Sequence, residues 1–172
     1  APAAYAEVTQ SQLSEARALD TKGDAAGAAK YYLDLSEKAG LVHQFADSQD
    51  PGAICNCCPD CCGGLRVLRM LPNPAAIVVT NHFSRLEPEL CDGCSACVDR
   101  CPMDAITMTA AGLADINLDR CIGCGLCINT CPTEALILVA KPEEALREPP
   151  FTSQFMRSSR EIESTLRRDI DR

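Results

Sequence analysis

The sequence is poor in aromatic residues, which usually supply much of the buried surface of a protein core. Phe and Tyr together make up 4% of the chain, and Trp is absent. A chain of 172 residues that lacks large rings needs another source of stability. Its thirteen cysteines are the obvious candidate.

The sequence also has no apolar run long enough to cross a membrane. The longest runs are AAIVV at 75–79 and ALILVA at 135–140, and both have the length of a β-strand. The N-terminal segment APAAYAEVTQ lacks the basic and apolar pattern of a secretory signal. We therefore expect a soluble, cytoplasmic protein without a membrane span.

Positive charge is scarce, because 16 Lys and Arg residues face 24 Asp and Glu residues and leave a net charge of −8. This acidic excess disfavours a nucleic-acid backbone or an anionic membrane as the main partner. The expected partner is a protein with a basic docking patch, either a redox partner or a larger oxidoreductase subunit.

An internal repeat with an offset of 30 residues occupies the middle of the chain. CDGCSACVDRCPMDAITM (91–108) aligns with CIGCGLCINTCPTEALIL (121–138), with every cysteine in register. Each half carries C-x2-C-x2-C-x3-C-P, the spacing of two-cluster ferredoxins, in which the fourth cysteine of each motif binds the other cluster. The predicted cofactors are two [4Fe-4S] clusters. Their predicted ligands are Cys91, Cys94, Cys97 and Cys131 for cluster 1, and Cys121, Cys124, Cys127 and Cys101 for cluster 2.

The main alternative for these eight cysteines is a pair of structural zinc sites, since C-x2-C pairs also bind zinc. Zinc sites use two pairs, whereas this repeat has two triplets, each followed by an outlying Cys-Pro. Each half is expected to form a cysteine loop, a short helix and a strand, and AAG at 110–112 predicts a hairpin turn between the halves.

Five further cysteines form the upstream element ICNCCPDCC at 54–62. Cys55, Cys58 and Cys61 repeat the C-x2-C-x2-C triplet, which predicts a third [4Fe-4S] cluster at this element. The fourth ligand is left open among Cys57, Cys62, His43 and His82. Zinc is an alternative cofactor, and reactive thiols are another interpretation. An unusual cluster is also open, because Cys61-Cys62-Gly63 is similar to one piece of the CCG motif of heterodisulfide reductase-like subunits.

The rest of the chain is predicted to contain helices. Ser11 or Ser14 can cap a first helix, and Asp24 can cap a second one that ends at Gly40. LRVLRML can form a short helix, and AAIVVT at 75–80 can form a strand or an extended connector. A capping box at Ser158 predicts a C-terminal helix. The expected regions are 1–48 (helical), 49–82 (Cys-rich metal-binding element and linker), 83–142 (dicluster domain) and 143–172 (tail with a helix).

Residues 83–142 resemble a bacterial-type two-[4Fe-4S] ferredoxin domain, with all eight ligand positions matched. The upstream segment 38–68 is similar to one found in a group of larger bacterial 4Fe-4S binding proteins, in which a CC-x2-CC element precedes the ferredoxin domain. That group implies electron transfer in redox complexes. Its N-terminal region with further cysteines has no counterpart here, so whether this chain is a short relative, a subunit or a fragment stays open.

The sequence shows no Ser-His-Asp constellation, no phosphate-binding glycine loop and no paired catalytic carboxylates. Asp104 and Glu134, in CPMDA and CPTEA, are interpreted as caps. We therefore predict no catalytic residue and an α+β fold, with a ferredoxin-like pseudo-symmetric domain preceded by an α-helical hairpin and a Cys-rich loop.

The predicted function is single-electron transfer through two or three [4Fe-4S] clusters, as a non-catalytic small subunit of a larger oxidoreductase. One alternative is a scaffold protein stabilised by zinc or iron–sulfur centres. Another is an enzyme with an unusual cluster at 55–62.

Overall fold

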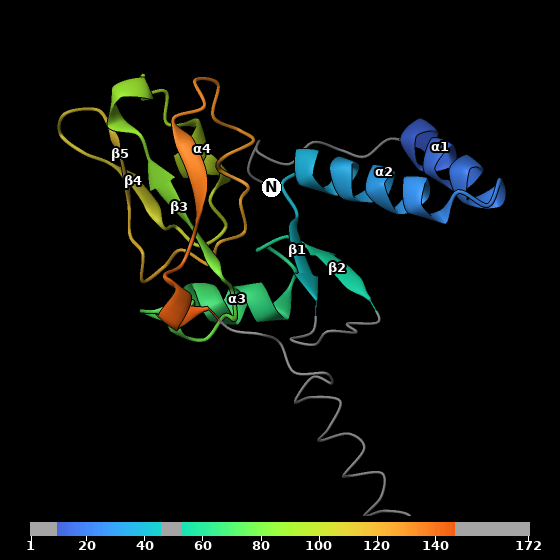
Figure 1. Ribbon diagram of the computed structural model, residues 1–172, viewed down its shortest axis with the longest axis horizontal. Helices are drawn as coiled ribbons and strands as arrows, with labels where there is room; N and C mark the ends of the chain where they lie inside the picture. Colours follow the sequence, from blue (N-terminus) through green and yellow to red (C-terminus); the bar gives the residue numbers. More distant parts are fainter. Residues whose placement is uncertain (1–9, 46–52, 147–172) are drawn as a thin grey trace, which may run out of the picture.

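The computed structural model describes residues 10–45 and 53–146 of the chain, and Figure 1 shows an α+β arrangement of helices and small sheets. The helices are α1 (Gln10–Thr21), α2 (Ala25–Lys38), α3 (Gly63–Met70) and α4 (Ala96–Arg100), with 3-10 helices η1 (Pro74–Ala76), η2 (Pro88–Leu90) and η3 (Glu143–Ala145). The strands are β1 (Val42–Phe45), β2 (Ile54–Cys57), β3 (His82–Leu86), β4 (Ile106–Met108), β5 (Ala114–Ile116) and β6 (Leu136–Ala140). The α+β class predicted from the sequence is confirmed, and the helix predicted after Ser158 lies outside the described residues.

Helices α1 and α2 form the predicted hairpin. The carboxylate of Asp24 accepts a hydrogen bond of 2.9 Å from the amide of Gly27, so the predicted cap of α2 is confirmed. The predicted cap of α1 is wrong, because the helix already begins at Gln10 and encloses both serines. The Ser14 hydroxyl donates to the Gln10 carbonyl at 2.8 Å instead.

The C-terminal end of α2 meets the repeat, whereas α1 lies farther from the sheets in Figure 1. The guanidinium of Arg100 donates to the carbonyl of Lys38 at 3.0 Å and to that of Glu37. The side chain of Asn129 donates to the carboxylate of Glu37. A cation at the last carbonyls of a helix satisfies groups that have no partner inside the helix. The hairpin is therefore fastened to both halves of the repeat.

Strand β3 precedes the first cysteine motif and strand β6 follows the second. They pair antiparallel, with Ser84 opposite Leu138, so the residues just before the first motif lie beside those just after the second. Strands β4 and β5 form the predicted hairpin between the halves, and Gly112 turns it with a φ of +77°. Both predicted strands of the repeat are confirmed.

The two halves differ in their helices. Helix α4 follows the first cysteine loop as predicted, but residues 126–130 of the second half form turns instead of a helix. The amides of Ile128 and Cys131 donate to carbonyls three residues earlier, at Gly125 and Ile128, with N–O distances of 3.0 and 3.1 Å. Such bonds make a tight turn rather than an α-helix.

The Cys-rich element begins with strand β2 and ends at helix α3. Strand β2 pairs antiparallel with β1, and α3 begins directly after Cys62. Helix α3 confirms the helix predicted for LRVLRML. Residues 75–80 contain no strand, because they continue from the 3-10 helix η1 into a turn and a bend. The side chain of Asn73 caps η1 by accepting a hydrogen bond of 3.0 Å from the amide of Ala76.

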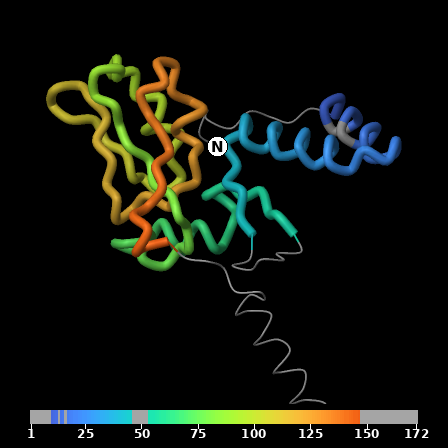
Figure 2. Tube along the Cα trace, in the orientation of Figure 1, coloured from blue at the N-terminus to red at the C-terminus, as the bar shows by residue number. Residues whose placement is uncertain are grey.

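Two buried groups of side chains form the core. The first centres on Leu65 and Met103 and joins the β1–α3 region to the second half of the repeat. The second centres on Ile106 and Leu136 and lies between the small sheets. Figure 2 follows the chain from the blue helical hairpin through the green α3 region into the yellow and orange repeat. No helix within 10–45 and 53–146 is both long and apolar enough to span a bilayer.

Candidate metal centres

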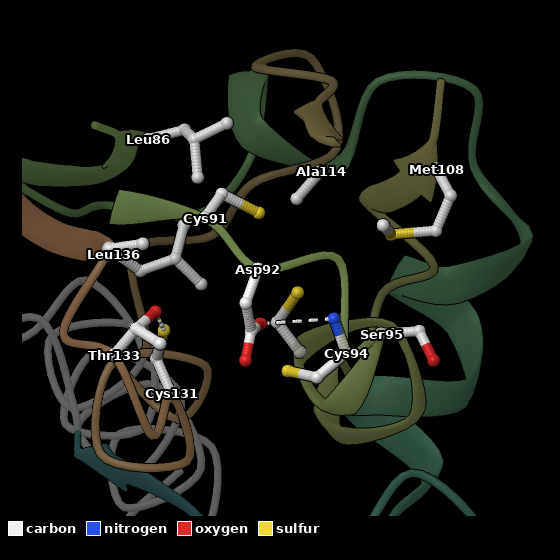
Figure 3. A pocket seen from close by; sticks show the side chains of 12 residues that line it. Leu86, Cys91, Asp92, Cys94, Ser95, Met108, Ala114, Cys131, Thr133 and Leu136 are labelled. Carbon is white, nitrogen blue, oxygen red and sulfur yellow. Dashed lines mark hydrogen bonds between the residues drawn. The ribbon is translucent and has the colours of Figure 1, made fainter. Parts of the chain in front are cut away.

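The first cavity lies between the loop after β3 and the turn before β6. About 300 Å³ of space lies between its lining atoms, and part of this space is open to solvent. Figure 3 shows Cys91, Cys94 and Cys131 arranged around this space, with Leu86, Met108 and Leu136 completing its apolar wall. Cys97 also lines it. The structure thus brings together three cysteines of the first motif and the last cysteine of the second.

The second cavity has the reciprocal composition, with about 330 Å³ of space between its lining atoms, part of it open to solvent. Three cysteines of the second motif line it together with the last cysteine of the first motif. Apolar side chains of Met103, Ile106, Ile116 and Ile122 complete the wall. Its four cysteines are Cys101, Cys121, Cys124 and Cys127.

The backbone has matching turns in both motifs. The left-handed region is occupied at Gly93 and Gly123, at Ser95 and Gly125, and at Asp104 and Glu134, with φ between +51° and +77°. Each pair is 30 residues apart. Left-handed residues reverse the chain sharply, so three thiols of one short loop can face the same cavity.

The glycine is required at two of these turns. A Cβ at Gly123 would lie 2.3 Å from the carbonyl oxygen of His82, and one at Gly93 would lie 2.6 Å from that of Gly112. Both distances are far below van der Waals contact with a backbone atom. The cysteine loops therefore pack directly against the neighbouring backbone, which a side chain at either position would push away.

The interpretation of Asp104 and Glu134 as caps is wrong. Both residues have positive φ and precede strands β4 and β6 rather than helices. The Asp104 carboxylate accepts two hydrogen bonds from Arg69. Its role is to join the turn to helix α3.

Hydrogen-bond donors surround the thiols of both cavities. The amide of Ala105 donates to the sulfur of Cys101 at 3.3 Å, and the buried Ser84 hydroxyl lies 3.2 Å from the sulfur of Cys127. The Thr133 hydroxyl lies 3.6 Å from the sulfur of Cys131. Donors of this kind stabilise thiolates and tune the metal groups that thiolates hold.

Burial raises the thiol pKa values in the cavities, and hydrogen-bond donors lower them. It raises the pKa of Cys124 to about 12 and that of Cys127 to about 11, although the Ser84 hydroxyl works against it at Cys127. Burial also opposes ionisation of Cys131, but the hydroxyl of Thr133 and nearby amides outweigh it and lower that pKa. Binding of a cationic metal group would have to displace protons from the buried thiols.

The five upstream cysteines include two close pairs, and the triplet of Cys55, Cys58 and Cys61 stays a prediction. The sulfurs of Cys58 and Cys61 are 2.6 Å apart, and the thiol of Cys57 hydrogen-bonds to that of Cys62. Cys55 is exposed and lies opposite Gln44 on the hairpin. The observed contacts therefore join two pairs, and Cys55 belongs to neither.

Neither histidine considered as a fourth ligand joins these thiols. His43 lies opposite Asn56, and its Nδ1 is 2.6 Å from the Asn56 Oδ1. Because neighbouring residues of a strand point to opposite faces, His43 faces away from Cys55 and Cys57. His82 is exposed and pairs with Ala140 in the β3–β6 sheet.

In the described part of the chain, no three His, Cys, Asp or Glu side chains come close enough to hold one metal ion. This holds for the two cavities as well as for the upstream element. The cavities nonetheless suit a larger group, because four cysteines line each of them around an empty space.

Comparison with known families gives one match. Residues 90–135 match the model of the 4Fe-4S dicluster domain. No curated protein sequence matches the chain well enough to count as a relative. The matched segment contains all eight cysteines of the two cavities, and a domain of this kind binds two [4Fe-4S] clusters.

Proposed function

We propose that this chain is an electron-transfer protein whose two [4Fe-4S] clusters are held by crossed ligand sets. Cys91, Cys94, Cys97 and Cys131 hold one cluster, and Cys121, Cys124, Cys127 and Cys101 hold the other. The observation that carries this proposal is the lining of the cavities, since each contains three thiols of one motif and the fourth of the other. When bound, each cluster supplies a centre that accepts and releases one electron.

Buried apolar side chains pack against the cysteines of both cavities. Met103, Leu126 and Leu136 are each at most 2% exposed, and they belong to the two buried groups that contact the thiols. An apolar surrounding limits the reorganisation of solvent and shifts the potential of an iron–sulfur centre. The matched left-handed turns support a pseudo-symmetric, bacterial-type ferredoxin domain.

The two cavities differ in their access to the surface. The first contains the exposed Cys94, whereas no cysteine of the second is exposed. Asp92 and Glu89 are exposed near Cys94, and the Asp92 carboxylate accepts from the amide of Cys94 at 3.1 Å (Figure 3). A redox partner with a basic patch would dock here.

This surface favours a role as a small subunit of a larger oxidoreductase. The α1–α2 hairpin, fastened through Arg100, offers a second surface that a minimal carrier does not need. We place this function in a reducing compartment such as the cytoplasm, because the thiolates that hold the clusters must stay reduced.

Anaerobic purification followed by metal and redox analysis tests this proposal. We expect at least about eight iron and eight sulfide per chain, and paramagnetic resonance signals of reduced [4Fe-4S] clusters after dithionite addition. A protein that holds zinc and gives no signal on reduction would instead be a metal-stabilised scaffold. Spectra of the 55–62 element that change with added thiols would instead favour an enzyme.

A further inference from the structure

The proposed function leaves the upstream cysteines unused, and four of them lie on the upstream loop, residues 57–62. Cys57 ends strand β2, and Cys62 directly precedes helix α3. Between them, residues 59–61 form a turn, and the amide of Cys62 donates to the carbonyl of Cys58 at 3.1 Å across it. A hydrogen bond between residues four positions apart closes a single tight turn.

This turn brings two thiols of the loop together. The sulfurs of Cys58 and Cys61, the close pair, are 2.6 Å apart. A disulfide bond joins sulfurs about 2 Å apart, so the close pair can be bridged without a large movement of the backbone. The contact suits a bond between the two sulfurs themselves, and it needs no cavity beside the loop.

The two thiols of the close pair differ in exposure. Cys61 is exposed, whereas Cys58 is half-buried next to the buried Pro59. An exposed thiol can meet the disulfide of another molecule, and a second thiol beside it can then resolve the mixed disulfide. The close pair therefore has one sulfur for the encounter and one for the resolution.

Both ends of the upstream loop are fixed in the protein core. Val42 lies opposite Cys57 in the β1–β2 pairing and is only 3% exposed. It packs in the same buried group as Leu65 of the first turn of α3, which is 0% exposed. A strand end and a helix start that share one core hold the turn between them in place.

The other upstream cysteines are less suited to exchange. The thiols of Cys57 and Cys62 also contact each other, but both are half-buried and pack against the buried group of Leu65. Cys55 is exposed and lies opposite Gln44, outside both pairs. An oxidant from solvent therefore reaches Cys61 before the inner pair, and Cys55 offers a matched single thiol on the same element.

From this geometry we propose that Cys58 and Cys61 form a reversible disulfide, a redox site that exchanges with an organic disulfide, RSSR. The Cys61 thiolate attacks the S–S bond of RSSR, which forms a mixed disulfide and releases one RS⁻. The Cys58 thiolate then attacks the Cys61 sulfur, which forms the Cys58–Cys61 bond and releases the second RS⁻. The protons of the two cysteines pass to the released thiolates, so RSSR is reduced to two RSH as the close pair is oxidised.

This site goes beyond the proposed function. The close pair moves two electrons together, whereas each cluster moves one. A reducing compartment keeps such a pair mainly as thiols, and an exposed disulfide is of the labile kind that reduction reopens. The same chain would then hold a thiol-based redox site beside its one-electron centres.

Glutathione disulfide, added to the anaerobically purified full chain, tests this proposal. The chain is then unfolded in N-ethylmaleimide, which labels every remaining thiol, and trypsin releases residues 39–66 with all five upstream cysteines. We expect this peptide to lose two labels to a disulfide that fragment ions place between Cys58 and Cys61. Cys55 should carry a glutathione instead, because it has no resolving partner in either pair. Dithiothreitol should restore all five labels.

Matched variants locate the site. In Cys57→Ser/Cys62→Ser, the Cys58–Cys61 disulfide should still form. Adding Cys58→Ser to that variant should leave a lasting glutathione adduct on Cys61, since the resolving thiol is gone. Cys55→Ser should lose only its own adduct. About eight irons retained in each variant show that the dicluster domain has folded.

Three results would overturn the inference. The first is a close pair that keeps both labels in excess glutathione disulfide, and the second is a disulfide between Cys57 and Cys62 in its place. The third is about twelve irons or a bound zinc ion, with upstream thiols that resist oxidation because they hold metal. All three leave the proposed function intact, whereas a chain that forms the disulfide but holds no iron refutes the proposed function alone. The unmodified chain decides the matter even where a variant fails to fold.

Discussion

Arg69 of helix α3 and Asp104, three residues after the fourth cysteine of the first motif, form a bidentate ion pair. The distances are 2.6 Å from Nε to Oδ2 and 2.7 Å from Nη2 to Oδ1. Close by, the guanidinium of Arg120 donates to the carbonyls of Met103, Leu71 and Arg69 at 2.8 to 3.0 Å. Two guanidinium groups therefore fasten the helix that follows the upstream loop to the turn that carries Cys101.

Removing the charge of Asp104 should loosen this junction. Asn tolerates the left-handed conformation of this residue, so Asp104→Asn removes the ion pair without new backbone strain. Both partners are about half exposed, so we expect a loss of only about 0.5–1 kcal/mol, or about 1–4 °C in the apparent Tm. Anaerobic thermal unfolding, followed by visible absorption, measures it.

Glu89→Gln is the control for this variant, because Glu89 is exposed and has no ion pair in the described part of the chain. Equal melting temperatures for the two variants would show that the Arg69–Asp104 pair contributes nothing to stability. Added salt should reduce the difference between them, since it screens exposed charges.

The crossed ligand sets predict a pattern of iron loss in double variants. Cys131→Ser should lose about four irons, because it removes a ligand of the cluster held by the first motif. Adding Cys94→Ser should cause little further loss, since both residues line the same cavity. Adding Cys124→Ser instead should remove about eight irons, because that residue lines the other cavity.

Local ligand sets would reverse this pattern. If each motif held its own cluster, Cys131→Ser and Cys124→Ser would act on one centre, and the combination with Cys94→Ser would cause the larger loss. Iron and sulfide counts for the single and double variants are therefore enough to decide between the two arrangements.

Gly123 and Gly125 should respond differently to alanine. Both have positive φ, so each substitution carries the strain of a left-handed alanine, about 1–2 kcal/mol. Only at Gly123 would the Cβ also approach a backbone oxygen, that of His82, whereas a Cβ at Gly125 meets nothing within 4 Å. Gly123→Ala should therefore have the lower apparent Tm and lose its clusters faster to a chelator. Equal rates of loss would contradict this role of the close backbone approach.

The Ser84 hydroxyl should raise the reduction potential of the second-cavity cluster. A hydrogen bond to a ligating sulfur stabilises the additional negative charge of the reduced state. Ser84→Ala removes the donor 3.2 Å from Cys127, so the potential should fall. Anaerobic redox titration with paramagnetic detection measures the shift.

Thr133→Val is the matched variant for the other cavity, since its hydroxyl lies 3.6 Å from Cys131. It should lower the potential of the first cluster and leave the second unchanged, with the smaller shift because the contact is longer. A shift of both potentials in either variant would point to a general change in packing instead.

Much of the candidate site follows from local sequence. The spacing of eight cysteines around Gly93 and Gly123 predicts the two quartets, and the structure places each quartet around its own cavity. Asp24 likewise predicts the start of α2, because the amide that its carboxylate caps, that of Gly27, is only three residues away in the sequence. Short-range features of this kind can be recognised without the rest of the fold.

Contacts between distant segments could not be predicted in this way. Strands β1 and β2 have four residues each and no clear alternation, and they depend on Val42 packing beside Leu65. The pairing of Cys57 with Cys62 depends on that hairpin. The Ser84–Cys127 contact joins residues that are 43 positions apart in the sequence, so no local sequence pattern predicts it.

The β3–β6 pairing has a consequence for biosynthesis. His82 and Ala140 are partners in the sheet that closes the domain around both motifs. While the ribosome adds residues one by one, the first cysteine loop is therefore complete well before the strand that encloses it has been made. Cluster insertion into the finished fold must then follow translation of β6, and a nascent chain halted before that strand would expose its thiols to oxidation and to competing metals.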